Sequence, residues 1–353
     1  MQLTHLGWSD VFARSFEPYA TQGYCIGRVA VAHRNQYHLY TEQGECPATI
    51  TGKFRHQART DQDFPAVGDW VVIHPQPKTT HALIDAILPR KSQFSRQAAG
   101  ISTKAQVLAA NIDTLFLVSG LDHDYNLRRI ERYLVIAWES GASPVIVLNK
   151  ADLCEDLDSK YMTVEDIAIG VPIISLSALH HNNLEALSPY LHLGATVALL
   201  GSSGVGKSTL TNQLMGYDLQ ATQTVRADDS RGRHTTTHRE MLCLPSGALL
   251  IDTPGMRELK LWTADEGFEE TFADIATLAQ HCHFRNCTHQ SEPGCVIRDA
   301  LETGLLSVSR LNNYQKLLRE QAYLHHRQDP QAQHNTKGRW KQITKTMRKH
   351  RKA

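Results

Sequence analysis

The chain has 353 residues, a length that suggests two or three domains rather than a single core. Its 37 Lys and Arg against 36 Asp and Glu give a net charge of +1, so the overall charge does not indicate a nucleic-acid binder. The N-terminus lacks a signal-peptide pattern, and no stretch approaches the roughly eighteen apolar residues of a membrane span. With an odd count of seven cysteines, these features predict reduced thiols and a cytoplasmic protein.

The first part of the chain predicts a small β-barrel after an N-terminal extension over residues 1–20. Short strand patterns separated by turn residues occur at 27–32, 37–40, 48–51, 68–73 and 81–87. This number of strands within about seventy residues favours a barrel of the OB type over residues 21–95, although other small barrels fit the same pattern. Residues 89–105 are expected to form a polar, basic connector that contains the first domain boundary.

Residues 105–265 alternate apolar runs with helical patterns, which is typical of an α/β domain with a mostly parallel sheet. The runs expected to form buried strands lie at 114–118, 145–148, 172–175, 196–200 and 248–251. A helix is expected over residues 128–139, between the first two runs. The motifs described next follow the ends of these runs.

A glycine-rich segment follows the run at 196–200 and opens a helical pattern. It fits G-x-x-x-x-G-K-[ST] and comprises Gly201, Ser202, Ser203, Gly204, Val205, Gly206, Lys207, Ser208 and Thr209. Glycines let backbone N–H groups turn toward a phosphate, and the helix N-terminus favours its negative charge. We expect Lys207 to bridge the β- and γ-phosphates and Ser208 to bind Mg²⁺. A chance glycine-rich turn is the alternative.

A second motif, which lies earlier in the chain, predicts selectivity for guanine. The sequence N-K-x-D comprises Asn149, Lys150, Ala151 and Asp152. The Asp152 carboxylate can accept the guanine N1–H and N2–H, whereas adenine would leave this carboxylate unpaired. Ser177 and Ala178 follow the next run and match an S-A element whose backbone N–H meets guanine O6.

A third motif, D-T-P-G, comprises Asp252, Thr253, Pro254 and Gly255. Asp252 ends an apolar run, where its carboxylate can hold Mg²⁺ through water, and the Gly255 N–H can meet the γ-phosphate. In an ordinary GTPase the phosphate loop precedes N-K-x-D, whereas here N-K-x-D comes first. This order predicts a circularly permuted GTPase domain.

Residues 231–237 lie between the phosphate loop and D-T-P-G, where a switch loop is expected. One threonine, Thr236 or Thr237, would complete the Mg²⁺ shell when a γ-phosphate is present, and an ordinary polar connector is the alternative. Met256 occupies the position where Ras-type GTPases carry the glutamine that orients the attacking water. A thioether cannot do this, so intrinsic hydrolysis should be slow unless another group or a partner orients the water. His234 is a candidate, and a solvated loop histidine is its simpler interpretation.

Three cysteines and a histidine nearer the C-terminus have the spacing of a metal site. The pattern C-x₄-C-x-H-x₅-C supplies enough ligands for a closed tetrahedral Zn²⁺ site with no position left for a reactive water. His281 and His283 are not needed for this set. We therefore expect one structural zinc, or alternatively four unmetallated residues, at Cys282, Cys287, His289 and Cys295.

The C-terminal part, residues 266–353, combines this cysteine-rich element with a helical pattern over 305–326 and a basic tail. From Lys337 to Ala353 there are eight Lys or Arg and no acidic residue. Such a run is either a solvated, disordered tail or a segment that contacts a phosphate backbone, and the two interpretations have similar weight.

Together, the permuted motif order and the Cys₃His spacing resemble the ribosome small-subunit-dependent GTPase A (RsgA) family over nearly the whole chain. The resemblance implies an N-terminal OB-fold barrel that binds RNA, a circularly permuted GTPase domain and a C-terminal zinc-binding α-helical domain. It also implies GTP and GDP with Mg²⁺, and one Zn²⁺, as the bound groups. The nucleotide and zinc positions of the family match the residues named above.

The same resemblance implies late maturation of the 30S ribosomal subunit, binding to 16S rRNA and GTP hydrolysis that the subunit stimulates. We expect a cytoplasmic monomer that does not bind membranes. The alternative function is an RNA-binding module for which GTP is a structural or regulatory ligand. A membrane or signalling GTPase is disfavoured because the sequence has no lipidation signal or hydrophobic anchor.

Overall fold

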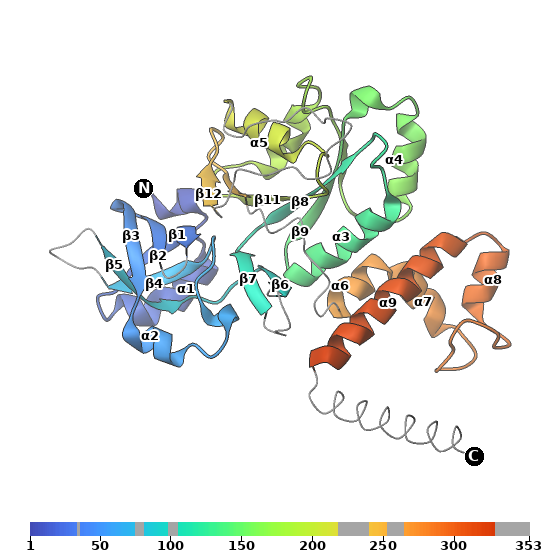
Figure 1. Cartoon of the computed structure of the whole chain (residues 1–353), viewed down its shortest axis with the longest axis horizontal. Helices are drawn as coiled ribbons and strands as arrows, with labels where there is room; N and C mark the ends of the chain where they lie inside the picture. Colours follow the sequence, from blue (N-terminus) through green and yellow to red (C-terminus); the bar gives the residue numbers. More distant parts are fainter. Residues whose placement is uncertain (34–35, 75–80, 98–104, 218–239, 253–264, 329–353) are drawn as a thin grey trace, which may run out of the picture.

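The computed structural model describes residues 1–33, 36–74, 81–97, 105–217, 240–252 and 265–328. A β-barrel, a central sheet with helices, and a C-terminal group of helices follow one another along the chain (Figure 1). Among the described helices, none is long and apolar enough to cross a membrane. The architecture confirms the fold class that the sequence predicts.

The barrel is formed by β1 (Cys25–His33), β2 (Gln36–Thr41), β3 (Gly44–Ile50), β4 (Trp70–His74) and β5 (Ala82–Ile87). The strand order β1-β2-β3-β5-β4 closes on itself because β4 pairs with β1, where Cys25 lies opposite Ile73. β3 and β5 are parallel, and the other neighbours are antiparallel. The short helix α2 (Gly52–Gln57) lies between β3 and β4 in the chain. The closed five-stranded barrel confirms the OB-type prediction.

The N-terminal extension packs against this barrel. It contains the 3₁₀ helix η1 (Leu3–Leu6) and the helix α1 (Asp10–Ala20). The ring centroids of Trp8 and Phe12 lie 4.8 and 5.9 Å from that of Trp70, and both Phe12 and Trp70 are buried. Aromatic pairs at these distances stabilise a core beyond their buried area, so the extension is part of the fold.

The central sheet has the strand order β10-β9-β8-β11-β13-β12. Its parallel strands are β8 (Thr114–Gly120), β9 (Ser143–Asn149), β10 (Ile173–Ser175), β11 (Thr196–Leu200) and β13 (Leu249–Asp252), and β12 (Glu240–Cys243) is antiparallel to β13. The helices of this part are α3 (Leu127–Ser140), α4 (Leu157–Glu165) and α5 (Lys207–Met215). Strands of this kind are apolar throughout because helices cover both faces of the sheet.

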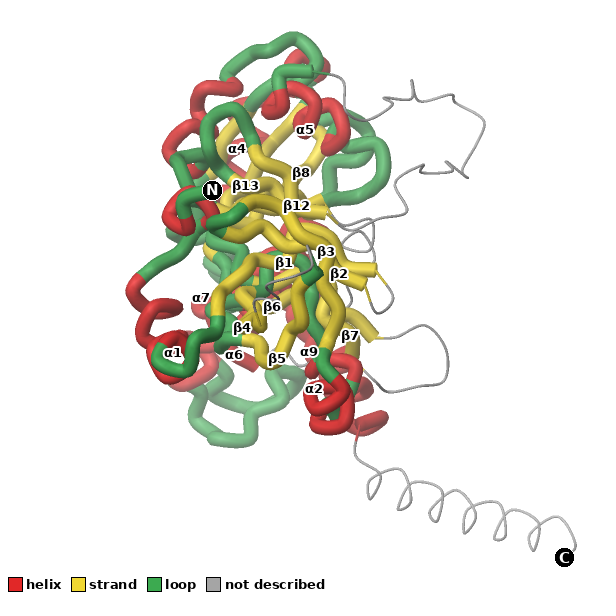
Figure 2. Tube along the Cα trace, turned by 90° about the vertical axis from the view of Figure 1, so that its left-hand side faces the viewer, coloured by secondary structure: helices red, strands yellow, loops and turns green. Residues whose placement is uncertain are grey.

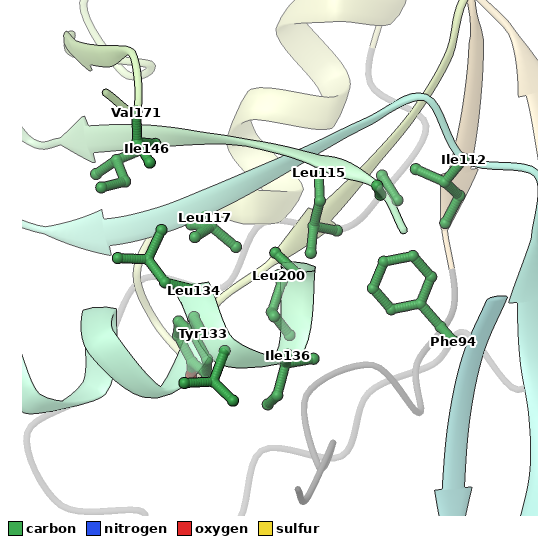
Figure 3. Close-up of a cluster of buried hydrophobic side chains, with 14 of the residues drawn as sticks. Phe94, Ile112, Leu115, Leu117, Tyr133, Leu134, Ile136, Ile146, Val171 and Leu200 are labelled. Atoms are coloured by element: carbon green, nitrogen blue, oxygen red, sulfur yellow. The ribbon is translucent and has the colours of Figure 1, made fainter. Parts of the chain in front are cut away.

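Alternate residues of β8 belong to the two hydrophobic cores on either side of the sheet. Leu115 and Leu117 face α3, where Tyr133, Leu134 and Ile136 pack against them (Figure 3). Phe116 and Val118 belong to the other core, together with Leu210 of α5. This period of two explains why β8 is buried at every position.

β12 joins the central sheet to the barrel. It lies between β13 and β1, and Val31 of β1 pairs with Glu240 of β12 (Figure 2). The two parts of the chain therefore share one continuous sheet of eleven strands.

The prediction of a polar connector over residues 89–105 was wrong in part. β6 (Gln93–Gln97) and β7 (Ala105–Ala110) form an antiparallel pair in this region. Phe94 of β6 is 1% exposed and belongs to the same core as Ile112 (Figure 3). A single buried aromatic residue anchors a strand whose other residues are mostly polar, so the hydrophobic pattern did not indicate it.

A buried arginine ties the N-terminal extension, the barrel and the segment after β7 together. Arg28 is 1% exposed and donates to the carbonyl oxygens of Leu6, Gly68 (3.2 Å) and Asn111 (3.1 Å). Burial lowers the pKa of Arg28 to about 10. Gly68 has φ +91° and a Cβ there would lie 2.1 Å from the Ala110 carbonyl oxygen, so only glycine fits this junction.

The C-terminal helices pack against α3 of the central part. They are α6 (Asp265–Thr271), α7 (Ala273–Gln280), α8 (Val296–Glu302) and α9 (Val308–Gln328). The fully buried Glu131 of α3 accepts hydrogen bonds from Arg310 Nη1 (2.8 Å) and Asn313 Nδ2 on α9. Arg310 also forms two bonds with the carboxylate of Asp274 on α7, at 2.7 and 2.8 Å. A buried ionic network therefore holds the C-terminal helices on α3.

Candidate nucleotide-binding site and metal centre

The predicted nucleotide motifs meet at one edge of the central sheet. The loops that follow β8, β9, β10 and β11 all leave the carboxyl ends of parallel strands, and Asp252 is the last residue of β13. In open α/β sheets, ligands bind outside the carboxyl ends of the strands. The sheet thereby brings together segments that are far apart along the chain, such as Asn149 and Asp252.

The phosphate loop runs from β11 to α5, which begins at Lys207. Gly206 has φ +97°, and a Cβ at this position would lie 2.2 Å from Asn149 Nδ2. The glycine is therefore required both by its backbone conformation and by the close approach of the base-reading segment. Lys207 Nζ donates to the Gly201 carbonyl oxygen at 2.7 Å and to that of Ser202 at 2.5 Å. The ammonium group thus lies over the loop that is expected to hold the phosphates.

Asn149 connects three segments of the site. Its side chain is almost fully buried, and its Nδ2 donates to the Val205 carbonyl oxygen of the phosphate loop at 2.8 Å. Its Oδ1 accepts the Ala178 N–H at 2.9 Å. The structure therefore joins N-K-x-D, the phosphate loop and the S-A element through one amide group, as a shared binding site requires.

Lys150 and Asp152 follow Asn149 in different environments. Lys150 has φ +65°, and its Nζ pairs with Asp122 Oδ2 at 2.6 Å. Partial burial raises the pKa of Asp122, but the hydrogen bonds from Lys150 and from the Asp124 N–H, together with the Lys150 charge, hold that pKa below its usual value. The Asp152 carboxylate is 24% exposed, and its Oδ2 lies 3.6 Å from His180 Nε2. Asp152 is accessible to a ligand, as a base-reading carboxylate must be.

The loop after β8 contributes residues that the sequence analysis missed. Asp122 holds Lys150, and Asp124 accepts a hydrogen bond from the Ser202 hydroxyl of the phosphate loop. Arg129, in the first turn of α3, donates to the Ser202 hydroxyl at 2.8 Å. Two acidic residues directly after an apolar strand were the available signal, because such residues lie at the edge of the sheet that binds ligands.

Several predicted residues lie outside the described part of the chain. These are Thr236 and Thr237 of the expected switch, Gly255 of D-T-P-G, and the neighbouring His234 and Met256. Their roles stay predictions. Ser208 lies in the first turn of α5, next to Lys207, where the motif requires it.

The four predicted metal ligands come together in the C-terminal part. The ligand atoms of Cys282, Cys287, His289 and Cys295 all lie within 4.8 Å of one another. His289 Nδ1 is 3.7 Å from Cys282 Sγ and 3.5 Å from Cys295 Sγ. Partial burial, together with the neighbouring thiols of Cys295 and Cys282, raises the pKa of Cys287 to about 11. Three sulfurs and one imidazole converging on one point form a donor set that fits a tetrahedral thiophilic cation.

The loop between the ligands is ordered by a single carboxylate. Glu292 accepts hydrogen bonds from the Thr288 hydroxyl and from the backbone N–H groups of Thr288, Gln290 and Ser291. These bonds hold the pKa of Glu292 far below its usual range. The carboxylate thus fixes the turn between His289 and Cys295 through hydrogen bonds outside the ligand set.

The order of strands, the phosphate loop and the base-reading segment define a P-loop GTPase domain with a permuted chain order. A family model described as RsgA GTPase matches residues 87–262. The chain is 49% identical to "Small ribosomal subunit biogenesis GTPase RsgA" of Opitutus terrae, over 97% of this chain and 96% of that protein. It is 50% identical to the protein named RsgA 2 of Lactiplantibacillus plantarum, over 88% of each chain. The chain belongs to the RsgA GTPase family.

Two solved structures share this fold. YjeQ from Thermotoga maritima has a TM-score of 0.64 and 28% identity, covering 85% of this chain and 99% of its own. The circularly permuted GTPase YloQ has a TM-score of 0.60 and 25% identity, covering 85% of this chain and 95% of its own. The description of YloQ as a circularly permuted GTPase agrees with the order that the motifs predict.

Proposed function

We propose that the protein is a GTPase that acts in biogenesis of the small ribosomal subunit. One observation carries this proposal: Asn149 joins the base-reading segment to the phosphate loop in a chain closely related to named RsgA proteins. The ligands of such a protein are GTP, GDP and the small ribosomal subunit. We further propose that the protein contacts 16S rRNA, works as a monomer and resides in the cytoplasm.

At the phosphate side, Lys207 would bridge the β- and γ-phosphates, and Ser208 and Asp252 would hold Mg²⁺. To do so, the Lys207 ammonium leaves the Gly201 and Ser202 carbonyl oxygens, which it contacts here. Thr236 or Thr237 completes the magnesium shell, and the Gly255 N–H meets the γ-phosphate. The bound Mg²⁺ supplies charge neutralisation for the transferred phosphate.

At the base side, the Asp152 carboxylate accepts the N1–H and N2–H of guanine. The accessibility of this carboxylate, beside the segment that Asn149 fixes, supports the assignment. The Ala178 N–H, which donates to Asn149 Oδ1 in this structure, would also donate to guanine O6. Adenine would cover the Asp152 carboxylate and leave it unpaired, which gives the selectivity for guanine.

We propose that the metal of the Cys₃His cluster is Zn²⁺ and that it is structural. Four protein ligands fill a tetrahedral shell, so no position remains for a metal-bound water, and the chemistry that the ion supplies is cross-linking of the loop. In this proposal the N-terminal extension covers residues 1–20, the RNA-binding barrel 21–95, the GTPase domain 105–265 and the zinc-binding part 266–353.

Hydrolysis measured without ribosomes, with small subunits and with large subunits tests the function directly. We expect slow intrinsic GTP hydrolysis and a clear stimulation by the small subunit alone. If the small subunit leaves the rate unchanged while still binding the protein, GTP is a structural or regulatory ligand of an RNA-binding module. No GTP binding at all would exclude both functions.

A further inference from the structure

The phosphate loop has a polar contact that none of the sequence motifs supplies. Ser202, the second residue of the loop, has a hydroxyl that lies 2.8 Å from Arg129 Nη1 and donates to Asp124 Oδ2. Arg129 Nη1 and Asp124 Oδ2 also pair directly, at 2.6 Å. The three side chains form a closed triangle of hydrogen bonds between the phosphate loop and the start of α3.

The triangle is held in place by the start of the helix. Asn126 caps α3, and its side-chain oxygen accepts the Arg129 N–H at 3.2 Å, which fixes the backbone of the arginine. The side chains of Arg129 and Asp124 are 32% and 25% exposed. Charge-assisted hydrogen bonds between such partly buried groups are stronger than neutral ones. The start of α3 therefore determines where the Ser202 hydroxyl lies.

The charges of the triangle matter for a phosphate ligand. Lys207 contacts the carbonyl oxygen of Ser202 and must leave it to reach a phosphate, whereas the contacts of the Ser202 hydroxyl involve other groups. An unpaired Asp124 carboxylate beside the loop would repel the phosphates, because like charges a few ångströms apart interact unfavourably. The guanidinium of Arg129 neutralises this carboxylate.

We propose that Arg129 is a positioning residue for guanine nucleotides. With Asp124 it holds Ser202, and through Ser202 the backbone N–H groups of the phosphate loop, while it cancels the charge of the Asp124 carboxylate. This inference rests on the proposed function, because it requires GTP at this loop. The loop contacts the β-phosphate that GTP and GDP share, so Arg129 acts on the binding of both nucleotides.

Nucleotide titrations with full-length variants test this role. Arg129→Ala is expected to raise the Kd for both GTP and GDP about tenfold, because a charge-assisted network is lost, and to leave kcat at saturating GTP within about twofold. Ser202→Ala should also raise both Kd values. The fold-increase in Kd of the double variant Ser202→Ala with Arg129→Ala should be smaller than the product of the two single fold-increases. Arg129→Ala with Asp124→Asn should bind more tightly than Arg129→Ala alone, since the unpaired charge is gone.

Arg132→Ala is the matched control. Arg132 lies on the same helix and pairs with Glu320 of α9, and its described contacts do not involve the phosphate loop. Its Kd values should equal those of the parent protein. Arg129→Lys, which keeps the charge, should bind with intermediate affinity and reports on the fold if Arg129→Ala is unstable.

Two results would overturn the positioning role: unchanged Kd values in Arg129→Ala, or a lower kcat with unchanged Kd, which would place Arg129 at the reacting phosphate. If adding Asp124→Asn to Arg129→Ala does not lower the Kd for GTP and GDP, the charge-neutralising role is overturned. A parent protein that binds no GTP would refute the proposed function itself, so the two failures are distinguishable.

Discussion

Asn149 shows how one side chain can serve two halves of a binding site. Its amide donates to Val205 in the phosphate loop and accepts from Ala178 in the S-A element, so both loops depend on one buried group. A buried amide that loses either partner leaves a polar group unsatisfied. The residue that the motif associates with guanine is therefore also a structural link between phosphate and base.

At the base, Asp152→Asn should reverse the nucleotide preference. The amide presents a donor where guanine also has donors, whereas xanthine has a carbonyl there, so GTP binding weakens and binding of xanthosine triphosphate improves. We expect the ratio of the two affinities to change on the order of a hundredfold. Competition binding with both nucleotides measures it, and Asp158→Asn on the exposed face of α4 is the control. An unaltered preference would remove Asp152 from the base site.

At the phosphates, Lys207→Ala and Ser208→Ala should both reduce turnover. Lys207→Ala removes the charge that stabilises the transferred phosphate, and we expect a loss on the order of a hundredfold or more in kcat. Ser208→Ala should instead make binding and turnover require more Mg²⁺. Rates measured over a Mg²⁺ titration separate the two effects, and parental rates in either variant would contradict its role.

At the level of elements, α3 connects the two sides of the molecule. Its first turn contacts the phosphate loop through Arg129, and its next turn holds the C-terminal helices through Glu131 and Arg132. Because successive residues on a helix point in different directions, one helix can serve both contacts at once. The nucleotide site and the C-terminal part thus share one rigid element.

The buried Glu131 should be essential for the stability of this contact. Glu131→Ala leaves Arg310 and Asn313 without their shared acceptor, and loss of one partner from a buried ionic network costs about 3 kcal/mol or more of unfolding free energy. Glu320→Ala removes the half-buried pair with Arg132 and should cost at most about 1 kcal/mol. Urea unfolding of both variants gives the comparison. Equal losses in the two variants would show that burial of Glu131 is not decisive.

The Cys₃His cluster should bind one zinc per chain and act on stability alone. Cys287→Ala removes one of four ligands, so we expect loss of the metal and local unfolding around α7 and α8, with GTP affinity within about twofold of the parent. Metal analysis, limited proteolysis and nucleotide titration provide the three measurements. Cys243→Ala, at an exposed cysteine outside the cluster, is the control. A metal-free protein with a fully folded C-terminal part would contradict the assignment.

The elements with strong sequence patterns were predictable, and those that depend on distant partners were not. The apolar runs gave the parallel strands, and the helix expected at 128–139 is α3 (Leu127–Ser140). β6 was missed because only Phe94 anchors it, and α1 because its one buried aromatic residue, Phe12, packs against Trp8 and against Trp70 of the barrel. In each case the stabilising contact comes from tertiary packing, which local patterns do not contain.

The residues of the candidate site also divide into those that the sequence predicts and those that only the folded structure reveals. Asn149, Lys207 and the four predicted metal ligands belong to motifs with fixed spacing, so their positions could be predicted directly from the sequence. Asp122, Asp124 and Arg129 belong to no motif, because their roles arise from the folded loop after β8. The structural role of Arg28 could not be predicted from the sequence either, because the three carbonyl oxygens that it contacts come from separate segments of the chain.

At the scale of the whole molecule, the permuted order places the D-T-P-G segment next to the C-terminal part. Asp252 ends the last strand of the central sheet, and the C-terminal helices begin at Asp265. The hypothesis that a change near Gly255 on loss of the γ-phosphate reaches these helices concerns residues 253–264, which lie outside the described part of the chain, so it stays a prediction. In a chain with the usual order, the same segment would lead back into the sheet.

The basic tail should contribute a salt-dependent share of subunit binding. Residues 337–353 carry eight Lys or Arg without acids, so we expect them to contact rRNA phosphates and to release counterions on binding. Deleting this segment should weaken small-subunit affinity and flatten its salt dependence while leaving GTP affinity unchanged. Subunit pelleting at several salt concentrations gives the slope. If neither affinity nor slope changes, the tail is a solvated appendage.

The pairing of Val31 with Glu240 has a consequence for synthesis of the chain. A chain leaves the ribosome from its N-terminus, and its domains generally fold in that order. The barrel can close through β1 and β4 early, but the end of β1 around Val31, beyond its pairing with β4, has no partner on that side until β12 emerges. Until then β1 offers unpaired backbone groups to any other strand, which is a known route to misassembly. The newly made protein therefore exposes this end of β1 from the time the barrel has been synthesised until β12 follows it.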